Sequence, residues 1–153
     1  MCLIPKEVNG KTIQIAEQDI VCYKYVFAGK KKWMPAYSPL PREYGYNKIL
    51  TAEKYNMIQS TMGVIPSHRY SKIKSLTCRL AYGEMFIEEG FHASLRGEDV
   101  PFMDNFYKRT KICVIPKGTE ICYGDNDDIV AVNMIVFKNV FHYIKYRIKN
   151  RKK

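Results

Sequence analysis

Aromatic and cationic side chains alternate along the first third of the chain, a pattern typical of a surface that binds an anion. Residues 23–25 read Tyr-Lys-Tyr, and residues 30–33 read Lys-Lys-Lys-Trp. Flat rings stack on nucleobases, and ammonium groups neutralise phosphates. On a strand the two tyrosines share a face with Val21 and Phe27, so core packing stays open as their alternative role. The residues that we assign to ring stacking on a ligand are Tyr23, Tyr25 and Trp33.

Further cationic side chains are candidates for contacts with the negative charge of a ligand. Lys24 stands between the two tyrosines, and His92 and Arg96 lie in or just after a Gly-Phe-His-Ala-Ser segment. Residues 116–119, Pro-Lys-Gly-Thr, form a turn that offers an anion a backbone N–H and an ammonium group. The same four residues also make an ordinary hairpin turn. The predicted anion contacts are Lys24, His92, Arg96 and Lys117.

The carboxyl-terminal segment holds the densest positive charge. Residues 145–153 include six basic residues and no acid, so this segment supplies more than half of the formal net charge of +10. Such a tail is attracted to nucleic acid, to an acidic protein or to an anionic membrane surface. A frayed terminus that only improves solubility is the alternative. The predicted nucleic-acid or anion contacts of the tail are Lys145, Arg147, Lys149, Arg151, Lys152 and Lys153.

Signatures of catalytic and metal sites are incomplete. No histidine lies within four residues of another histidine or of a cysteine, and there is no Cys-x-x-Cys pair, whereas zinc sites show close pairs. Ser94 lacks the Gly-x-Ser-x-Gly elbow of hydrolases, and no glycine-rich phosphate loop occurs. The adjacent carboxylates at 88–89 and at 127–128 point apart on an extended chain. We therefore predict no catalytic residue, no metal and no cofactor.

Length and composition fit one globular domain of a reducing compartment. The chain has 153 residues, of which 46% are hydrophobic and 26% charged, enough to bury a core without a disulfide or metal. Its five cysteines are odd in number and irregularly spaced, unlike those of a secreted disulfide scaffold. No segment resembles a signal peptide, and no run reaches the roughly 20 apolar residues of a membrane span. We therefore expect a cytoplasmic protein with no membrane span.

The elements that must position these residues are mostly strands. Short runs of β-branched and aromatic residues alternate with turn signals, and they predict strands at residues 12–15, 20–27, 33–37, 44–50, 80–87, 90–93, 111–115, 121–123 and 129–137. Capping residues and apolar spacing predict helices over 51–61, 99–109 and 140–148. Residues 140–148 also partly alternate as a strand would, so a strand stays open there. Residues 66–76 are expected to form a long loop.

These elements predict an α+β fold with a mainly antiparallel, curved or partly closed β-sheet and two or three short helices. Residues 1–137 form a single β-rich globular domain in this interpretation. Residues 138–153 form a basic C-terminal helix or tail.

Three segments carry a resemblance to a known family. They are Asp19–Lys24 (DIVCYK), Gly90–Ser94 (GFHAS) and Cys113–Thr119 (CVIPKGT). In order and spacing they resemble a family of small uncharacterised proteins of phages and prophages of Bacteroidota. The resemblance covers most of the chain up to about Phe137 and leaves the basic tail outside. It implies a phage accessory protein that acts inside the host cell, and it implies no particular chemistry.

The same order of segments is similar, more loosely, to ADP-ribosyltransferase-like folds. Those enzymes place a glutamate before a late strand, whereas residues 125–128 of this chain read Asp-Asn-Asp-Asp. The likeness implies an enzyme that uses NAD, in which His92 and Ser94 hold the cofactor and Asp127 or Asp128 replaces the glutamate.

The leading hypothesis is a non-enzymatic, phage-type accessory protein that binds an anionic partner. That partner is a nucleotide, a nucleic acid or an acidic host protein, and an anti-defence role fits each of them. The NAD-dependent transferase and a minor structural virion protein are the alternatives. The protein would act in the host cytoplasm or in the virion, and a homo-oligomer stays open.

Overall fold

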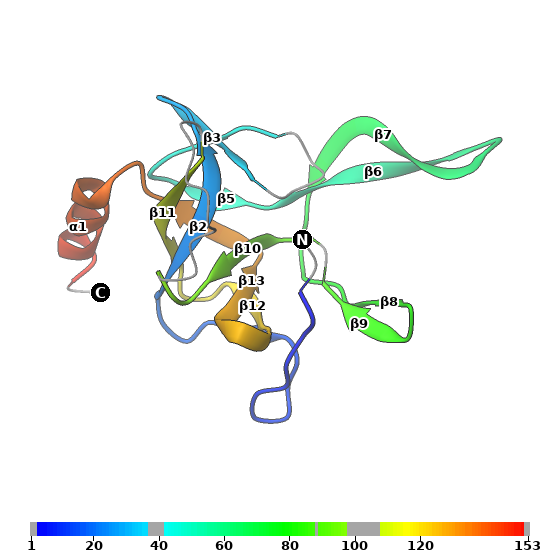
Figure 1. Cartoon of the computed structure of the whole chain (residues 1–153), viewed down its shortest axis with the longest axis horizontal. Helices are drawn as coiled ribbons and strands as arrows, with labels where there is room; N and C mark the ends of the chain where they lie inside the picture. The colour runs from blue at the N-terminus through cyan, green and yellow to red at the C-terminus, as the bar shows by residue number, and fades with distance from the viewer. Residues whose placement is uncertain (1–2, 37–41, 88, 98–107, 152–153) are drawn as a thin grey trace.

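The computed structural model describes residues 3–36, 42–87, 89–97 and 108–151 of the chain (Figure 1). Ten strands form one antiparallel sheet, in the order β1-β12-β13-β10-β2-β11-β14-β5, with β3 on β2 and β4 on β3. Their bounds are β1 Gln14–Ile15, β2 Ile20–Ala28, β3 Lys32–Pro35, β4 Tyr44–Gly45, β5 Ile49–Thr51, β10 Phe91–Ser94, β11 Lys108–Ile115, β12 Glu120–Tyr123, β13 Asp128–Ala131 and β14 Asn133–Val136. The path is open at both ends, so the sheet is not closed.

Strands β2 and β11 form the long central pair of this sheet. Their register runs from Lys108 opposite Phe27 to Ile115 opposite Ile20. Along β2, buried side chains alternate with half-buried ones, as they do on a strand with one face toward the core. Cys22, Lys24 and Val26 face inward, and Tyr23 and Tyr25 face outward.

The apolar run at residues 129–137 forms two strands rather than the single strand that we predicted. The chain leaves β13 at Val132, which is buried, and enters β14 on another part of the sheet. The N–H of Val132 donates to the Glu120 carbonyl at 3.1 Å, and its own carbonyl accepts from Ala52 at 2.9 Å. Both halves are buried on both faces, which is why their sequence reads as one continuous strand.

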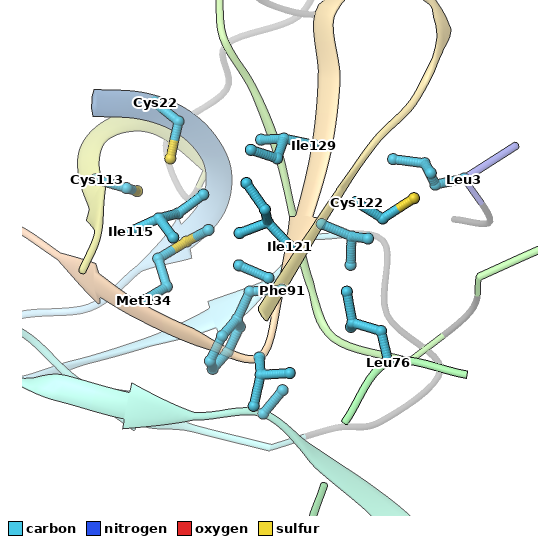
Figure 2. Packing of buried hydrophobic residues seen from close by; sticks show 14 of the residues in the cluster. Leu3, Cys22, Leu76, Phe91, Cys113, Ile115, Ile121, Cys122, Ile129 and Met134 are labelled. Carbon is cyan, nitrogen blue, oxygen red and sulfur yellow. The ribbon is translucent and has the colours of Figure 1, made fainter. Parts of the chain in front are cut away.

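The main core includes buried side chains from β2, β10, β11, β12, β13 and β14. Figure 2 shows Cys22 and Cys113 side by side near Ile115 and Met134, with Phe91 beneath them. Trp33, Tyr44 and Phe91 form a second group of rings, with centroids 5.1 to 6.0 Å apart. Burial of apolar surface of this kind is the dominant favourable term in folding.

Two hairpins project from the sheet (Figure 1). The longer one, β6 (Glu53–Ser60) and β7 (Gly63–Lys72), occupies the region where we predicted a helix over 51–61 and a loop over 66–76, so both predictions are wrong. The hydroxyl of Thr51 donates to Asn133 Oδ1 across β5 and β14 at 2.9 Å and caps no helix. Cross-strand pairs such as Tyr55 with Tyr70, 5.0 Å between ring centroids, outweigh local helix propensity. The shorter hairpin pairs β8 (Arg79–Ala81) with β9 (Glu84–Phe86).

The predicted C-terminal helix is confirmed as α1 (Val140–Lys149). Asn139 is its N-cap, and the side-chain oxygen of Asn139 accepts a hydrogen bond from the His142 N–H at 3.2 Å. The rings of Tyr143 and Tyr146 pack on Phe137, 5.7 and 5.4 Å away, over a small cluster that includes Val114. The helix therefore covers the outer face of β11 and β14 through its tyrosines.

The α+β class with a mainly antiparallel sheet is confirmed. In the part of the chain that the structure describes, the helical elements are α1 and a one-turn 3-10 segment at Asp125–Asp127. The predicted helix over residues 99–109 falls mostly outside the described residues. At its end, Lys108 and Arg109 belong to β11 instead.

Candidate anion-binding pocket

A pocket of about 760 Å³ lies between α1, the segment before β2 and the turn between β11 and β12. Its volume falls within the range of sites for small ligands, roughly 300–1,000 Å³. Three segments that are far apart in the sequence build its wall. The lining residues are Glu17, Gln18, Asp19, Pro116, Lys117, Tyr146, Arg147, Ile148, Asn150 and Arg151.

The carboxylate of Asp19 holds this pocket together. Its Oδ1 accepts a hydrogen bond from the backbone N–H of Lys117 at 2.8 Å, and its Oδ2 accepts one from the Tyr146 hydroxyl at 2.7 Å. One side chain therefore ties both the turn and the helix to the start of β2. Burial and the hydrogen bond to Asp19 raise the pKa of Tyr146 to about 12, so the hydroxyl stays a donor at neutral pH.

Three cations line the pocket: Lys117 from the turn, and Arg147 and Arg151 from α1 and its end. All three side chains are exposed. Within the described residues none of them forms a salt bridge. Their charge faces two acids in the lining, Glu17 and Asp19, and Asp19 already accepts two hydrogen bonds. The wall is therefore cationic overall and offers donors to an anion.

The structure corrects the prediction that Lys24 contacts a ligand. Lys24 is only 8% exposed, and its ammonium group donates to the backbone carbonyl of His92 at 2.6 Å. Burial lowers the pKa of Lys24 to about 8, while nearby Cys113 and Cys22 act weakly in the other direction. The side chain is an interior group that spans from β2 to β10.

The predicted stacking role of Trp33 is also wrong. Trp33 is 1% exposed, its indole N–H donates to the Gly45 carbonyl at 3.1 Å, and its ring lies against Tyr44 and Phe91. No face of this ring is open to a ligand. Its place after three lysines in the sequence reflects the solvated turn that precedes β3.

Tyr23 and Tyr25 lie on the outer face of β2 and are half-buried. The backbone of Gly97 lies against the Tyr23 ring, so that a β-carbon at position 97 would sit 3.4 Å from it. The two rings are therefore partly covered. They are neither fully buried in the core nor fully open for stacking on a ligand. They lie outside the pocket lining.

Arg96 is engaged by an acid of its own chain. Its Nε lies 2.5 Å from Asp127 Oδ2, and its N–H donates to the Ser94 hydroxyl at 3.1 Å. Ser94 lies opposite Asp128 in the β10–β13 register, and His92 is half-buried on the same strand. The residues of the transferase-like interpretation are therefore neighbours, but the Arg96 guanidinium already binds the Asp127 carboxylate.

The pocket joins Lys117 with two of the six predicted tail cations. Lys145 and Lys149 are exposed on α1 outside the lining, and Lys152 and Lys153 lie outside the described residues. Sequence reasoning did not find Asp19 or Tyr146. No local pattern marks them, because they meet only when residues 127 positions apart come into contact.

Buried thiols and metal-binding side chains form no second site in the described part of the chain. Cys22, Cys113 and Cys122 are free and buried, and a hydrogen bond to Cys113 together with burial raises the pKa of Cys22 well above its usual value. A thiol of this kind is a poor nucleophile. Within the described residues no three histidine, cysteine or acidic side chains cluster as metal ligands do. None of the helices in that part of the chain is long and apolar enough to cross a membrane.

Comparisons with protein-family models, with curated proteins and with solved structures gave no match to this chain.

Proposed function

We propose that this chain is a non-enzymatic binding protein whose pocket beside α1 captures a phosphate-bearing ligand of nucleotide size. The observation that carries the proposal is the meeting of Lys117, Arg147 and Arg151 in a pocket of about 760 Å³. The three cations come from separate segments, and no acid among the described residues neutralises them in a salt bridge. Phosphate is the natural partner of such a cluster.

The shape of the site favours a nucleotide over the other anionic partners. The pocket is a hollow with a size typical of small-molecule sites. Nucleic acid or an acidic protein would contact a broad cationic surface instead. The side-chain N–H groups of Lys117, Arg147 and Arg151 suit phosphate oxygens, and Ile148 supplies an apolar contact for the rest of the ligand.

A phage accessory role in the host cytoplasm fits this proposal. A small protein that sequesters a nucleotide lowers its free concentration by mass action and needs no catalytic group. Capture of a nucleotide signal of host defence would be one such use. Binding, rather than turnover, is the activity that the proposal assigns to the chain.

The test is calorimetric titration of the purified protein with nucleoside mono-, di- and triphosphates, followed by pocket variants. Lys117→Ala and Arg147→Ala each remove one cation from the wall. We expect each to weaken binding by roughly tenfold, the usual effect of losing one charged hydrogen-bond donor. Lys145→Ala is the matched control, because it removes the same charge from the same helix outside the pocket.

The salt dependence of nucleotide affinity distinguishes binding in the pocket from general attraction to the cationic surface. Equal weakening in Lys117→Ala and Lys145→Ala, with affinity that falls steeply as salt is added, would mean general attraction to a cationic surface. Absence of binding to every nucleotide in the series would refute the proposal. An absorbance excess at the nucleic-acid wavelength in freshly purified protein would instead identify a retained ligand for extraction.

A further inference from the structure

The outer half of the long hairpin is apolar and uncharged. We call β6, β7 and their turn the arm (residues 53–72), and residues 56–67 the arm tip. No Asp, Glu, Lys or Arg occurs in the tip, although a quarter of the whole chain is charged. Its exposed apolar side chains are Met57, Ile58, Met62, Val64 and Ile65, of which Met62 is 90% exposed.

Both faces and both edges of the arm tip are without a cover in the described chain. Ile58 pairs with Ile65 on one face, and Met57 pairs with Pro66 on the other. The two strands form a sheet of their own, so neither has a second neighbouring strand among the residues that the structure describes. Isolated two-stranded hairpins are marginal in water, and uncharged, unpaired edges are the ones that meet other chains.

A second apolar surface lies on α1, on the side away from the sheet. Tyr143 and Tyr146 make the packed side of the helix. At about 100° per residue, Val140, Phe141, Ile144 and Ile148 fall within one arc on the opposite side. All four are exposed, Phe141 by 75%. We call these four residues the α1 stripe.

Cations flank the α1 stripe on both sides. Lys145 and Lys149 lie on one side of it and Arg147 on the other. Between residues 140 and 151 there is no acid. Two α1 stripes brought face to face would place these cations together, and like charges across an interface are unfavourable. The stripe therefore needs a partner surface that is apolar and without positive charge.

The arm tip meets these requirements. It presents apolar side chains and carries no charge that would repel the flanking cations. The free edges of its two strands expose backbone carbonyls, and Lys145 and Lys149, which lie outside the pocket lining, have N–H groups that can donate to them. The two surfaces hold nine of the fifteen large hydrophobic side chains that are exposed in the described residues. One contact would bury both.

The two surfaces lie at opposite ends of the long axis of the molecule (Figure 1). They cannot meet within one chain. We propose that the arm tip of one copy docks on the α1 stripe of a second copy, in a head-to-tail contact. A contact of this type uses two different surfaces, so repetition builds a ring or an open chain of copies.

A mixing experiment tests the proposal. The tip variant is Ile58→Gln with Met62→Gln, and the stripe variant is Phe141→Gln with Ile144→Gln. All four side chains are exposed and the changes leave the net charge untouched, so we expect the fold and the general electrostatics to be retained. Sedimentation velocity across a concentration series measures assembly, and circular dichroism checks each variant for folding. Should either pair unfold, the single changes Met62→Gln and Phe141→Gln replace it.

We expect the wild type to assemble with rising concentration and both variants to weaken assembly by about tenfold or more. An equimolar mixture of the two variants still contains one intact tip and one intact stripe, so it should form a one-to-one dimer and stop there. The matched control is Leu80→Gln with Tyr82→Gln, two exposed apolar residues at the β8–β9 hairpin. This control should assemble like the wild type.

Three results would overturn the proposal. One is a wild type that stays monomeric at every concentration. Another is a mixture of variants that fails to pair, which would indicate contact between like surfaces. The third is a monomer that sediments with phosphatidylserine vesicles through Phe141 and Ile144, which would make a membrane the partner of α1. Ile148 belongs to both the α1 stripe and the pocket lining, so the stripe variant leaves it unchanged. Phe141 and Ile144 do not line the pocket, so nucleotide titration of this variant keeps the test separate from the proposed function.

Discussion

Basic side chains are buried in one region of this molecule and exposed in another. Lys24 lies in the interior at the β2–β10 junction, where its partner is a backbone carbonyl. Lys117 and Arg147 are exposed and line the pocket beside α1. Lys24 has aromatic neighbours in the sequence, and Lys117 has none within three residues. A lysine that is next to aromatic residues in a strand sequence therefore need not share a binding surface with them, because successive side chains point to opposite faces.

Trp33→Ala is the change with the largest expected effect on this comparison. It empties the space of a fully buried ring that packs on Tyr44 and Phe91. We expect the free energy of unfolding to fall by about 3–5 kcal/mol in urea titrations, with nucleotide affinity of the folded fraction unchanged. Trp33→Phe, which keeps a ring, is the milder control. If Trp33→Ala abolished nucleotide binding without lowering the free energy of unfolding, Trp33 would have to contact the ligand after all.

Lys24→Met tests the interior cation itself. A methionine fills the same space without the cost of burying a charge. The pKa of Lys24 drops from 10.5 to about 8 on folding, a difference worth on the order of 3 kcal/mol at neutral pH. We expect the variant to be more stable than the wild type at pH 7 by up to this amount, measured by urea unfolding.

The stability difference between Lys24→Met and the wild type should depend on pH. Below about pH 8 the folded wild type carries the buried charge and its full cost. Between pH 8 and 10.5 the unfolded chain binds the proton and the folded chain does not, so wild-type stability gains with rising pH. The advantage of Lys24→Met should therefore shrink over that window. Cys22, with its raised pKa, acts in the opposite direction at alkaline pH, so the two proteins are compared at each pH.

Lys111→Met is the matched control for Lys24→Met. Lys111 lies directly opposite Lys24 in the β2–β11 register but is only half-buried. Burial, Arg109 and Lys138 lower its pKa. We expect a smaller change in stability than for Lys24→Met. An equal change in both would mean that burial of Lys24 is not the cause.

Asp19→Asn tests the carboxylate that assembles the pocket. An amide offers one acceptor oxygen in place of two, so it keeps the bond to either Lys117 N–H or the Tyr146 hydroxyl. We expect a loss of stability of about 1–2 kcal/mol and a pKa of Tyr146 below its present value of about 12, followed by ultraviolet titration of tyrosine. An unchanged tyrosine titration would mean that Asp19 does not raise the pKa of Tyr146.

Glu17→Gln has the smallest expected effect and tests the electrostatics of the pocket. Glu17 is an exposed acid on the wall and opposes an anionic ligand. Its neutralisation should tighten nucleotide binding by roughly two- to threefold, as expected for an exposed charge. The measurement is calorimetric titration at low salt. Glu7→Gln, an exposed acid outside the lining, is the control and should leave the affinity unchanged.

Strands were predictable where burial and local preference agree. Residues 20–27, rich in β-branched and aromatic residues, and residues 111–115, rich in β-branched ones, were predicted as strands and form most of the central pair β2 and β11. The C-terminal helix was predictable from its four-residue spacing, although the packed side is that of the tyrosines and the repeated Val140 and Ile144 are exposed. The arm was not predictable, because its strands are stabilised by each other across the turn at Gly63 rather than by local preference.

Of the candidate site, the sequence indicated the cations but not their arrangement. Lys117, Arg147 and Arg151 were each identified from turn chemistry or from charge density, in separate hypotheses. Their meeting in one pocket depends on the position of α1 over β11 and β14. Trp33 and Lys24 were assigned to the surface because one-dimensional alternation does not say which face of a strand the core covers.

The amino-acid sequence by itself determined the class of fold, the basic balance, the lack of complete catalytic motifs and the helical C-terminus, because composition, charge and periodicity are local properties. Only the tertiary structure decided which cations remain at the surface and which surfaces stay uncovered. Asp19 binds the turn and α1 at once, and Lys24 is enclosed by strands far from it in sequence. Long-range contacts of this kind are set by the packing of the whole sheet, and no window of neighbouring residues contains them.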